Sequence, residues 1–155
     1  MAEPIEYDIL LNLKTALEAI SIAGGYHHDV GAVSVDPADH TEALLGTSAQ
    51  VPFFIVEIAT ARGLQYFPAS QLLERIPVDI TAAHNAEQLV QTARLQTFQR
   101  LAADIEKALT VDVTRGGRAT DTRIVDKQMF MSVGGQRVLA VVQCEVRLYR
   151  EYGKP

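Results

Sequence analysis

The sequence is poor in the residues that carry redox, metal or covalent chemistry. It has one cysteine, Cys144, and no tryptophan in 155 residues. A single cysteine excludes a disulfide within the chain, and its place in an apolar, strand-like run favours a small buried core residue over a reactive thiol. A chain of this length buries roughly 70% of the surface that it exposes when unfolded, so neither a disulfide nor a structural metal is needed. We therefore expect one domain spanning residues 1–155.

The sequence also lacks a surplus of positive charge and a long apolar run. Its 14 Lys and Arg against 19 Asp and Glu give a net charge of −5, which argues against wrapping duplex DNA, because that task calls for a basic face. The longest apolar run, residues 51–61, is interrupted by Glu57 and is too short for a membrane helix. Residues 1–4 do not begin a signal-peptide pattern. We expect a protein made in the cytoplasm, with no membrane partner.

Apolar side chains recur at three- and four-residue steps in two stretches, which is the pattern of an amphipathic helix. We expect one helix over residues 5–23 and a second over residues 89–109. Asn85 is a plausible N-cap for the second helix, because a glutamine follows three residues later as in a capping box. Carboxylates in the second helix, such as Asp104 and Glu106, are assigned to its solvent-exposed face.

Five further segments have the apolar character of strands. They lie at residues 30–35, 52–59, 72–82, 121–133 and 136–149. Two long stretches without a clear period, 38–50 and 61–70, are expected to be loops. The last two strands form a long hairpin that turns at Gly134-Gly135, since such a pair can take the positive φ angles of a two-residue turn. The order α-β-β-β-α-β-β predicts an α+β fold with a mostly antiparallel sheet of about five strands and two helices packed on one face.

The turn fixes the register of the hairpin. If it is a two-residue turn, Val133 faces Gln136, and residues directly opposite each other share one face of the sheet. The face assigned to the core collects Met129, Met131 and Val125 with Val138, Ala140, Val142, Cys144 and Val146. The other face places Phe130 opposite Leu139 and Gln128 opposite Val141, so both faces are apolar near the tip.

Two explanations fit an apolar tip. A helix or loop of the same domain covers it, or a partner chain packs on Phe130, Leu139 and Val141, because apolar patches left on a surface mark interaction sites. A β-bulge would shift the register and change the faces.

Catalytic and metal-binding patterns are few in this sequence. His27-His28-Asp29 and His40 are the candidate metal ligands, but adjacent histidines in a strand point to opposite faces, so a solvated polar turn is favoured. No nucleophile elbow, P-loop or dinucleotide fingerprint occurs. We predict no enzymatic activity, no cofactor and no metal.

A basic loop, Arg115-Gly116-Gly117-Arg118, follows the second helix. It is expected to be flexible, and it is either a solvated connection or a contact for phosphate or an acidic partner surface. No interleaved aromatics support base stacking there.

Four features follow one another along the chain. An amphipathic helix runs into Gly25-Tyr26-His27-His28-Asp29-Val30-Gly31, and an apolar strand begins Pro52-Phe53-Phe54-Ile55-Val56. The second helix precedes Gly116-Gly117, and the last strand ends in Tyr149-Arg150, with Gly153 and Pro155 close behind. Together they resemble, over nearly the whole chain, the tail terminators (minor tail protein U type) of long-tailed bacteriophages and phage-like particles.

The resemblance implies a structural virion protein at the junction of tail and neck, assembled in the host cytoplasm. A homohexameric ring would cap the tail tube, end its polymerisation and present a surface to the head connector, while DNA passes through the lumen without specific binding. The hairpin and the two long loops, including Tyr66 and Phe67, are the expected contacts with neighbouring subunits, the tube protein and the connector.

Two alternatives remain open. The chain is another neck, head–tail connector or completion protein, which sequence barely separates from a terminator. Or it is a small ligand-binding or enzymatic α+β domain, which would need polar groups converging in a pocket between sheet and helices.

Overall fold

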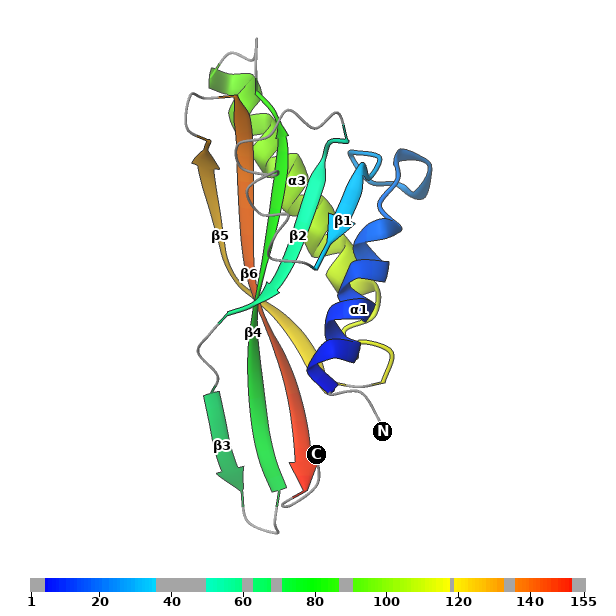
Figure 1. Cartoon of the computed structure of the whole chain (residues 1–155), viewed down its shortest axis with the longest axis vertical. Helices are drawn as coiled ribbons and strands as arrows, with labels where there is room; N and C mark the ends of the chain where they lie inside the picture. Colours follow the sequence, from blue (N-terminus) through cyan, green and yellow to red (C-terminus); the bar gives the residue numbers. More distant parts are fainter. Residues whose placement is uncertain are drawn as a thin grey trace.

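The computed structural model of the chain describes residues 5–35, 50–59, 63–67, 71–86, 91–117, 119–132 and 136–151, with backbone alone at 63–67, 71–73 and 149–151. Figure 1 shows the elements. They are α1 (Ile5–Glu18), the short 3-10 helix η1 (Ile22–Gly24), β1 (Ala32–Ser34), β2 (Phe53–Ile58), β3 (Gly63–Phe67), β4 (Gln71–Asn85), α3 (Gln91–Val111), β5 (Asp121–Met131) and β6 (Arg137–Glu151). Among the described residues, no helix is both long and apolar enough to span a lipid bilayer.

The strands form one sheet with the order β1-β2-β4-β6-β5, and β3 pairs with β4 beside this path. The β1–β2 pair is parallel, and the pairs β2–β4, β3–β4, β4–β6 and β5–β6 are antiparallel. The predicted α+β class, the mostly antiparallel sheet and the order of elements are therefore confirmed, with β3 as an additional strand.

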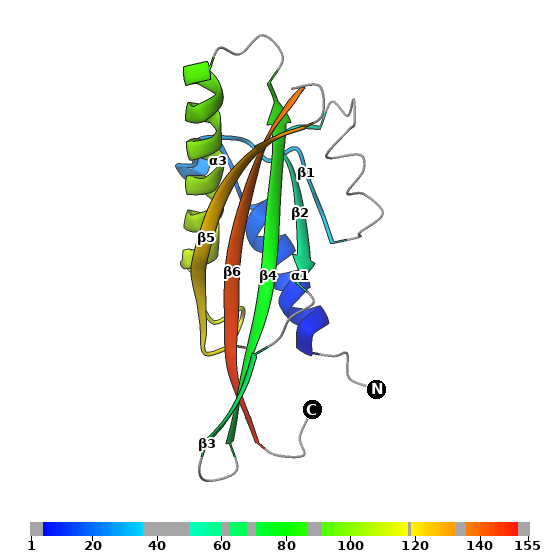
Figure 2. The same ribbon diagram turned by 90° about the vertical axis from the view of Figure 1, so that its left-hand side faces the viewer.

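The centre of the sheet is the ladder between β4 and β6. Each strand is 15 residues long, and the two pair without interruption from Gln71 opposite Glu151 to Asn85 opposite Arg137. Strands of this length are two to three times the usual ~5–6 residues. The ladder therefore extends past both helices at one end, where β3 joins it (Figures 1 and 2).

Both helices pack on one face of this sheet, as predicted. The alternate residues Ile76, Val78, Ile80 and Ala82 of β4 point toward them and are fully buried. The same core contains Ile9, Leu13 and Leu17 of α1, Leu101, Ile105 and Leu109 of α3, and Val142, Cys144 and Val146 of β6. Burial of each large aliphatic side chain contributes about 1.5–3 kcal/mol, so this layer is the main source of stability.

The opposite face of the sheet carries no helix of the described chain, yet one end of it is apolar. Phe53 and Ile55 of β2, Ala83 of β4 and Leu139 of β6 form a second buried cluster there. Leu139 is 5% exposed, so it belongs to the interior of the domain.

Several boundaries differ from the sequence predictions. The first helix was expected over residues 5–23, but α1 ends at Glu18 and Ile22–Gly24 form the separate helix η1. Residues 61–70 were expected to be a loop, but Gly63–Phe67 form β3 and pair with Gln71–Arg75 of β4. Asn85 was expected to cap the second helix, but it is the last residue of β4 and pairs with Arg137. The cross-strand ladder outweighs the local capping preference at Asn85. Most of the predicted loop 38–50 lies outside the described residues.

The predicted hairpin register is confirmed for the half near the turn. Phe130 lies opposite Leu139 and Asp126 opposite Gln143, as the two-residue turn required, although Gly134-Gly135 itself lies outside the described residues. A bulge then shifts the pairing by one residue at Val125. Val125 was assigned to the core, but the bulge leaves it 64% exposed.

Candidate assembly surface

Strand β5 lies at the end of the sheet path and pairs, among the described strands, with β6 alone. Its other edge therefore presents backbone N–H and C=O groups that no described strand satisfies. Such an edge is a template for another chain unless charge, proline or a bulge protects it.

The two halves of β5 differ in this protection. The first half carries the ion pair Arg123–Asp121 (2.8 Å) and ends at the Val125 bulge, next to Asp126. The second half, from Gln128 to Met131, has no charged residue. The unprotected part of the edge is therefore the stretch Gln-Met-Phe-Met at the hairpin tip.

This stretch also exposes large apolar side chains on both faces of the strand. Phe130 is 47% exposed on the helix-free face, and Met129 and Met131 are about two-fifths exposed on the other. The two methionines were assigned to the core, and their positions on an edge strand explain the difference. We call Met129, Phe130 and Met131 the β5 patch.

The three predicted interface residues of the hairpin differ in solvent exposure. Phe130 is exposed and belongs to the β5 patch, whereas Leu139 is buried against Phe53, Ile55 and Ala83. Val141 is partly buried. Cover by the domain itself, the first explanation for the apolar tip, therefore holds for Leu139, whereas Phe130 is left to solvent and a partner on it stays a prediction.

Arg115, in the loop after α3, is buried rather than solvated as the sequence indicated. Arg115 is 1% exposed, and its Nη2 donates to the carbonyl of Leu109 (2.5 Å) and to that of Asp112. The last carbonyls of a helix lack intrahelical partners, so the guanidinium caps the C-terminal end of α3. Burial lowers the pKa of Arg115. Arg115 is therefore a structural residue rather than a surface contact.

Asp112 organises the backbone of the same loop. Its carboxylate accepts from the N–H and hydroxyl of Thr114 (2.9 and 2.6 Å) and from the N–H of Gly116 (2.8 Å). These hydrogen bonds hold the pKa of Asp112 below its usual value. Arg118 lies outside the described residues, as do the side chains of Tyr66 and Phe67, whose backbone forms part of β3.

A buried carboxylate joins α3 to the turn that follows η1. Asp104 is 1% exposed and accepts from the backbone N–H groups of His27 (2.8 Å) and His28 (3.0 Å) and from Nδ1 of His28 (2.9 Å). The prediction that Asp104 lies on the solvent-exposed face of the helix is wrong. Its spacing contained the signal, because it lies three residues after Leu101 and four before Ala108, both on the buried stripe.

His28 in turn packs its ring edge-on against His84 of β4, with 5.3 Å between ring centroids. Nδ1 of His84 accepts from the N–H of Asn85 (2.8 Å), so in the neutral ring Nε2 carries the proton. Nδ1 of His28 faces Asp104. Neither ring presents two free nitrogens, and no group of three potential metal ligands occurs within the described part of the chain.

The segment that carried the family resemblance has a structural role at almost every position. Gly25 has φ +87°, which favours glycine, and its carbonyl accepts from Nζ of Lys107 (2.9 Å). The same Nζ lies 4.6 Å from the ring centroid of Tyr26. Asp29 accepts from the N–H of Ile22 (2.8 Å), and a Cβ on Gly31 would meet the carbonyl carbon of Gln50 at 2.6 Å. The motif holds the α1–β1 connection against α3.

Cys144 faces the core from β6, as predicted. Burial raises the pKa of the Cys144 thiol to about 12. At neutral pH it is a protonated, inaccessible apolar group, which accords with a packing role.

An open groove of about 240 Å³ lies between α1 and the end of α3. Its walls include Ala16, Ala19, Tyr26 and Ala108, and its charged members, Asp112 and Arg115, form the hydrogen bonds of the loop described above. The groove lies between the helices rather than between sheet and helices, where a ligand-binding domain was expected to have its pocket.

A row of polar side chains crosses the helix-free face. In the register of the sheet, Glu57 of β2 lies opposite Asp79 of β4, Asp79 opposite Gln143 of β6, and Gln143 opposite Asp126 of β5. Residues directly opposite share a face, so three carboxylates lie in one line across four strands. Burial raises the pKa of Asp79 within this row.

No protein-family model matches this chain, and no curated protein matches it in sequence.

The anchoring role of Asp104 predicts a large loss of stability on its removal. Asp104→Ala would leave two buried backbone N–H groups and the His28 ring without an acceptor, which we expect to lower the free energy of unfolding by about 3 kcal/mol. Urea denaturation measures this. Glu106→Ala is the control: it removes a surface pair with Lys127 (2.6 Å) and should cost less than about 1 kcal/mol. Equal costs for the two variants would contradict the anchoring role.

The half-buried His84 predicts a pH dependence of stability. Burial, followed by the proximity of His28 and Arg137, lowers the pKa of His84 below its usual 6.5. The unfolded chain therefore binds the proton more readily, and stability falls as pH decreases through 6.5 toward the folded-state pKa. We expect the urea midpoint to drop between pH 7.5 and 5.5, and to drop less in His84→Asn, whose amide oxygen can still accept from Asn85. The exposed His27→Asn is the control, and identical pH profiles for His84→Asn and the unaltered chain would refute this assignment.

Proposed function

We propose that this chain is a structural subunit that assembles with copies of itself into a closed ring, and that the ring serves as the tail terminator of a phage or phage-like tail. The observation that carries the proposal is the β5 patch: an unprotected strand edge with Met129, Phe130 and Met131 exposed. A soluble protein that left such an edge uncovered would be prone to association.

The family resemblance supplies the specific role. A head-to-tail contact repeated around an axis closes into a ring when the rotation per subunit completes a circle. The two ends of such a ring differ. One would match the end of the tail tube and the other would not, so that tube subunits stop adding and the head connector docks instead.

The row of Glu57, Asp79 and Asp126 supports the passage of DNA. A ring that turned its helix-free face inward would line its lumen with these carboxylates, and repulsion from the phosphates would keep DNA from sticking. The end of the sheet that extends past the helices, where β3, β4 and β6 run together (Figure 1), would provide a contact for the tube or the connector.

The test compares the unaltered chain with Phe130→Lys, because lysine is a natural protector of strand edges. Light scattering over a concentration series, with negative-stain images, should give rings of about six chains for the unaltered protein and a lower mass for Phe130→Lys. Val111→Lys is the matched control: Val111 is 76% exposed at the end of α3, where a cation is well tolerated.

Three results would contradict the proposal. They are a monomer at every concentration, a compact dimer at every concentration, and association that Phe130→Lys leaves unchanged. Circular dichroism of each variant shows whether the fold is retained.

A further inference from the structure

A second exposed apolar surface lies on α1. Tyr7 is 46% and Leu11 38% exposed, and their spacing of four residues places them one turn apart on the same side of the helix. The buried residues of α1, Ile9, Leu13 and Leu17, form a different stripe that faces the sheet. We call Tyr7 and Leu11 the α1 patch.

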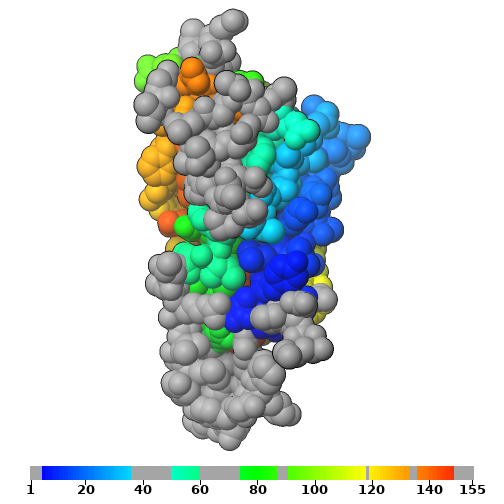
Figure 3. Space-filling model, in the orientation of Figure 1, coloured from blue at the N-terminus to red at the C-terminus, as the bar shows by residue number. Residues whose placement is uncertain are grey.

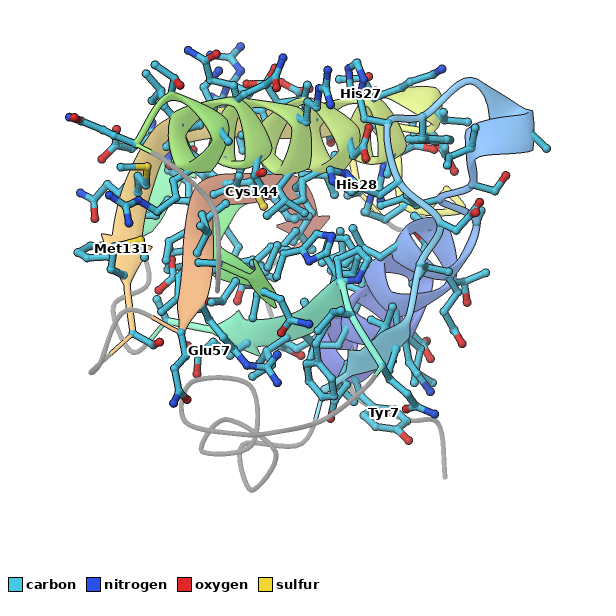
Figure 4. All side chains as sticks on the ribbon, turned by 90° about the horizontal axis from the view of Figure 1, so that it is seen from above. Tyr7, His27, His28, Glu57, Met131 and Cys144 are labelled. Carbon is cyan, nitrogen blue, oxygen red and sulfur yellow. The ribbon has the colours of Figure 1, made fainter. Side chains whose placement is uncertain are left out.

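The α1 patch and the β5 patch lie on opposite sides of the molecule. In Figure 1, β5 forms one lateral margin of the domain and α1 the other. Figure 4, which looks along the long axis, shows the same separation, with Met131 and Tyr7 labelled at opposite sides. In the space-filling view of Figure 3, the β5 and α1 colours likewise occupy opposite flanks.

Two different surfaces on opposite sides are what a head-to-tail contact needs. A contact between two β5 edges would use the same surface twice and would close at a dimer, whereas a contact between unlike surfaces leaves one of each free for the next subunit. We propose that the β5 patch of one protomer docks on the α1 patch of the next copy of this chain. This inference rests on the proposed ring and names its contact.

The charges beside the two patches are complementary. Helix α1 contains Glu6, Asp8 and Glu18 against the single cation Lys14. The first half of α3, residues 91–100, contains Arg94 and Arg100 and no carboxylate. Because α3 runs alongside β5 (Figure 2), an acidic margin on one copy would meet a basic margin on the next. Complementary charge of this kind orients the approach and disfavours contacts between like surfaces.

The side chains suit the two sides of such a contact. Phenylalanine and tyrosine are typical anchors at the centre of interfaces, and methionine adapts its shape to an uneven surface. Phe130 would pack between the turns of α1 that carry Tyr7 and Leu11, and the two methionines, on the other face of β5, would border the contact from the opposite side of the strand edge. That contact would also remove the uncharged end of the β5 edge from solvent.

Cysteine trapping tests the contact directly. Cys144 is buried and protonated, so the chain provides a background without a reactive thiol. The cysteines are placed beside the contact, so that Leu11 and Phe130 keep their side chains: Lys14 lies three residues after Leu11 on α1, and Gln128 lies two residues before Phe130 on the same face of β5. The variant Lys14→Cys/Gln128→Cys, oxidised mildly at a concentration where the chain assembles, should give a ladder of covalent oligomers. Each single variant should give no covalent oligomer under the same conditions, and a mixture of the two should give a covalent dimer containing one of each.

The control pairs Gln128→Cys with Val111→Cys, because Val111 is 76% exposed and lies outside the α1 patch. Because docking raises the effective concentration of the two thiols, cross-linking of the Lys14/Gln128 pair should be at least about tenfold faster than that of the control pair.

Two outcomes overturn the inference and leave the proposed ring standing. In one, the chain assembles by light scattering but the Lys14/Gln128 pair cross-links no faster than the control. In the other, Gln128→Cys alone forms covalent dimers at a high rate, which identifies a contact between two β5 edges. A chain that stays monomeric by light scattering overturns the ring and this contact together.

Discussion

The ladder between β4 and β6 is the interaction on which the rest of the structure depends. Fifteen residues of each strand pair without a break, which fixes a helix-facing row on both strands and gives α1 and α3 one surface to cover. The same length leaves β3 joined to an end that extends beyond the helices. It also places β5 outside β6 as the last described strand, so the exposed β5 patch is a consequence of how the sheet is built. The surface proposed for assembly thus follows from the same pairing that holds the core together.

The fold was largely predictable from local pattern. Apolar spacing located both helices, and assuming a two-residue turn at Gly134-Gly135 predicted the observed hairpin pairs from Asp126 to Met131. Prediction failed where a long-range partner overrode a local signal. Asn85 has the composition of a cap but pairs with Arg137, and the weakly periodic residues 63–67 become β3 because β4 offers them an edge. The bulge at Val125 has no local marker, so its exposure could not be anticipated.

The candidate surface was predictable only in part. The register placed Phe130 opposite Leu139 correctly, but which of the two stays exposed depends on the neighbours that β2 and β4 bring to Leu139. The burial of charged residues was predicted least well. Asp104 binds backbone groups about 77 residues away in the chain, and Arg115 folds under the end of its own helix. Sequence composition suggests that such residues are solvated, and only the fold supplies the donors and carbonyls that let them be buried.

The central claim is that the second half of the β5 edge is open in the single subunit and covered in the assembly. Hydrogen–deuterium exchange of peptides spanning residues 126–131, in dilute protein and in assembled rings separated by size, measures this most directly. We expect the amides of these residues to exchange markedly more slowly in the rings, because an edge removed from solvent gains protection. Peptides from the end of α3, residues 106–111, should exchange alike in both samples. Equal exchange of residues 126–131 in rings and single subunits would contradict the account.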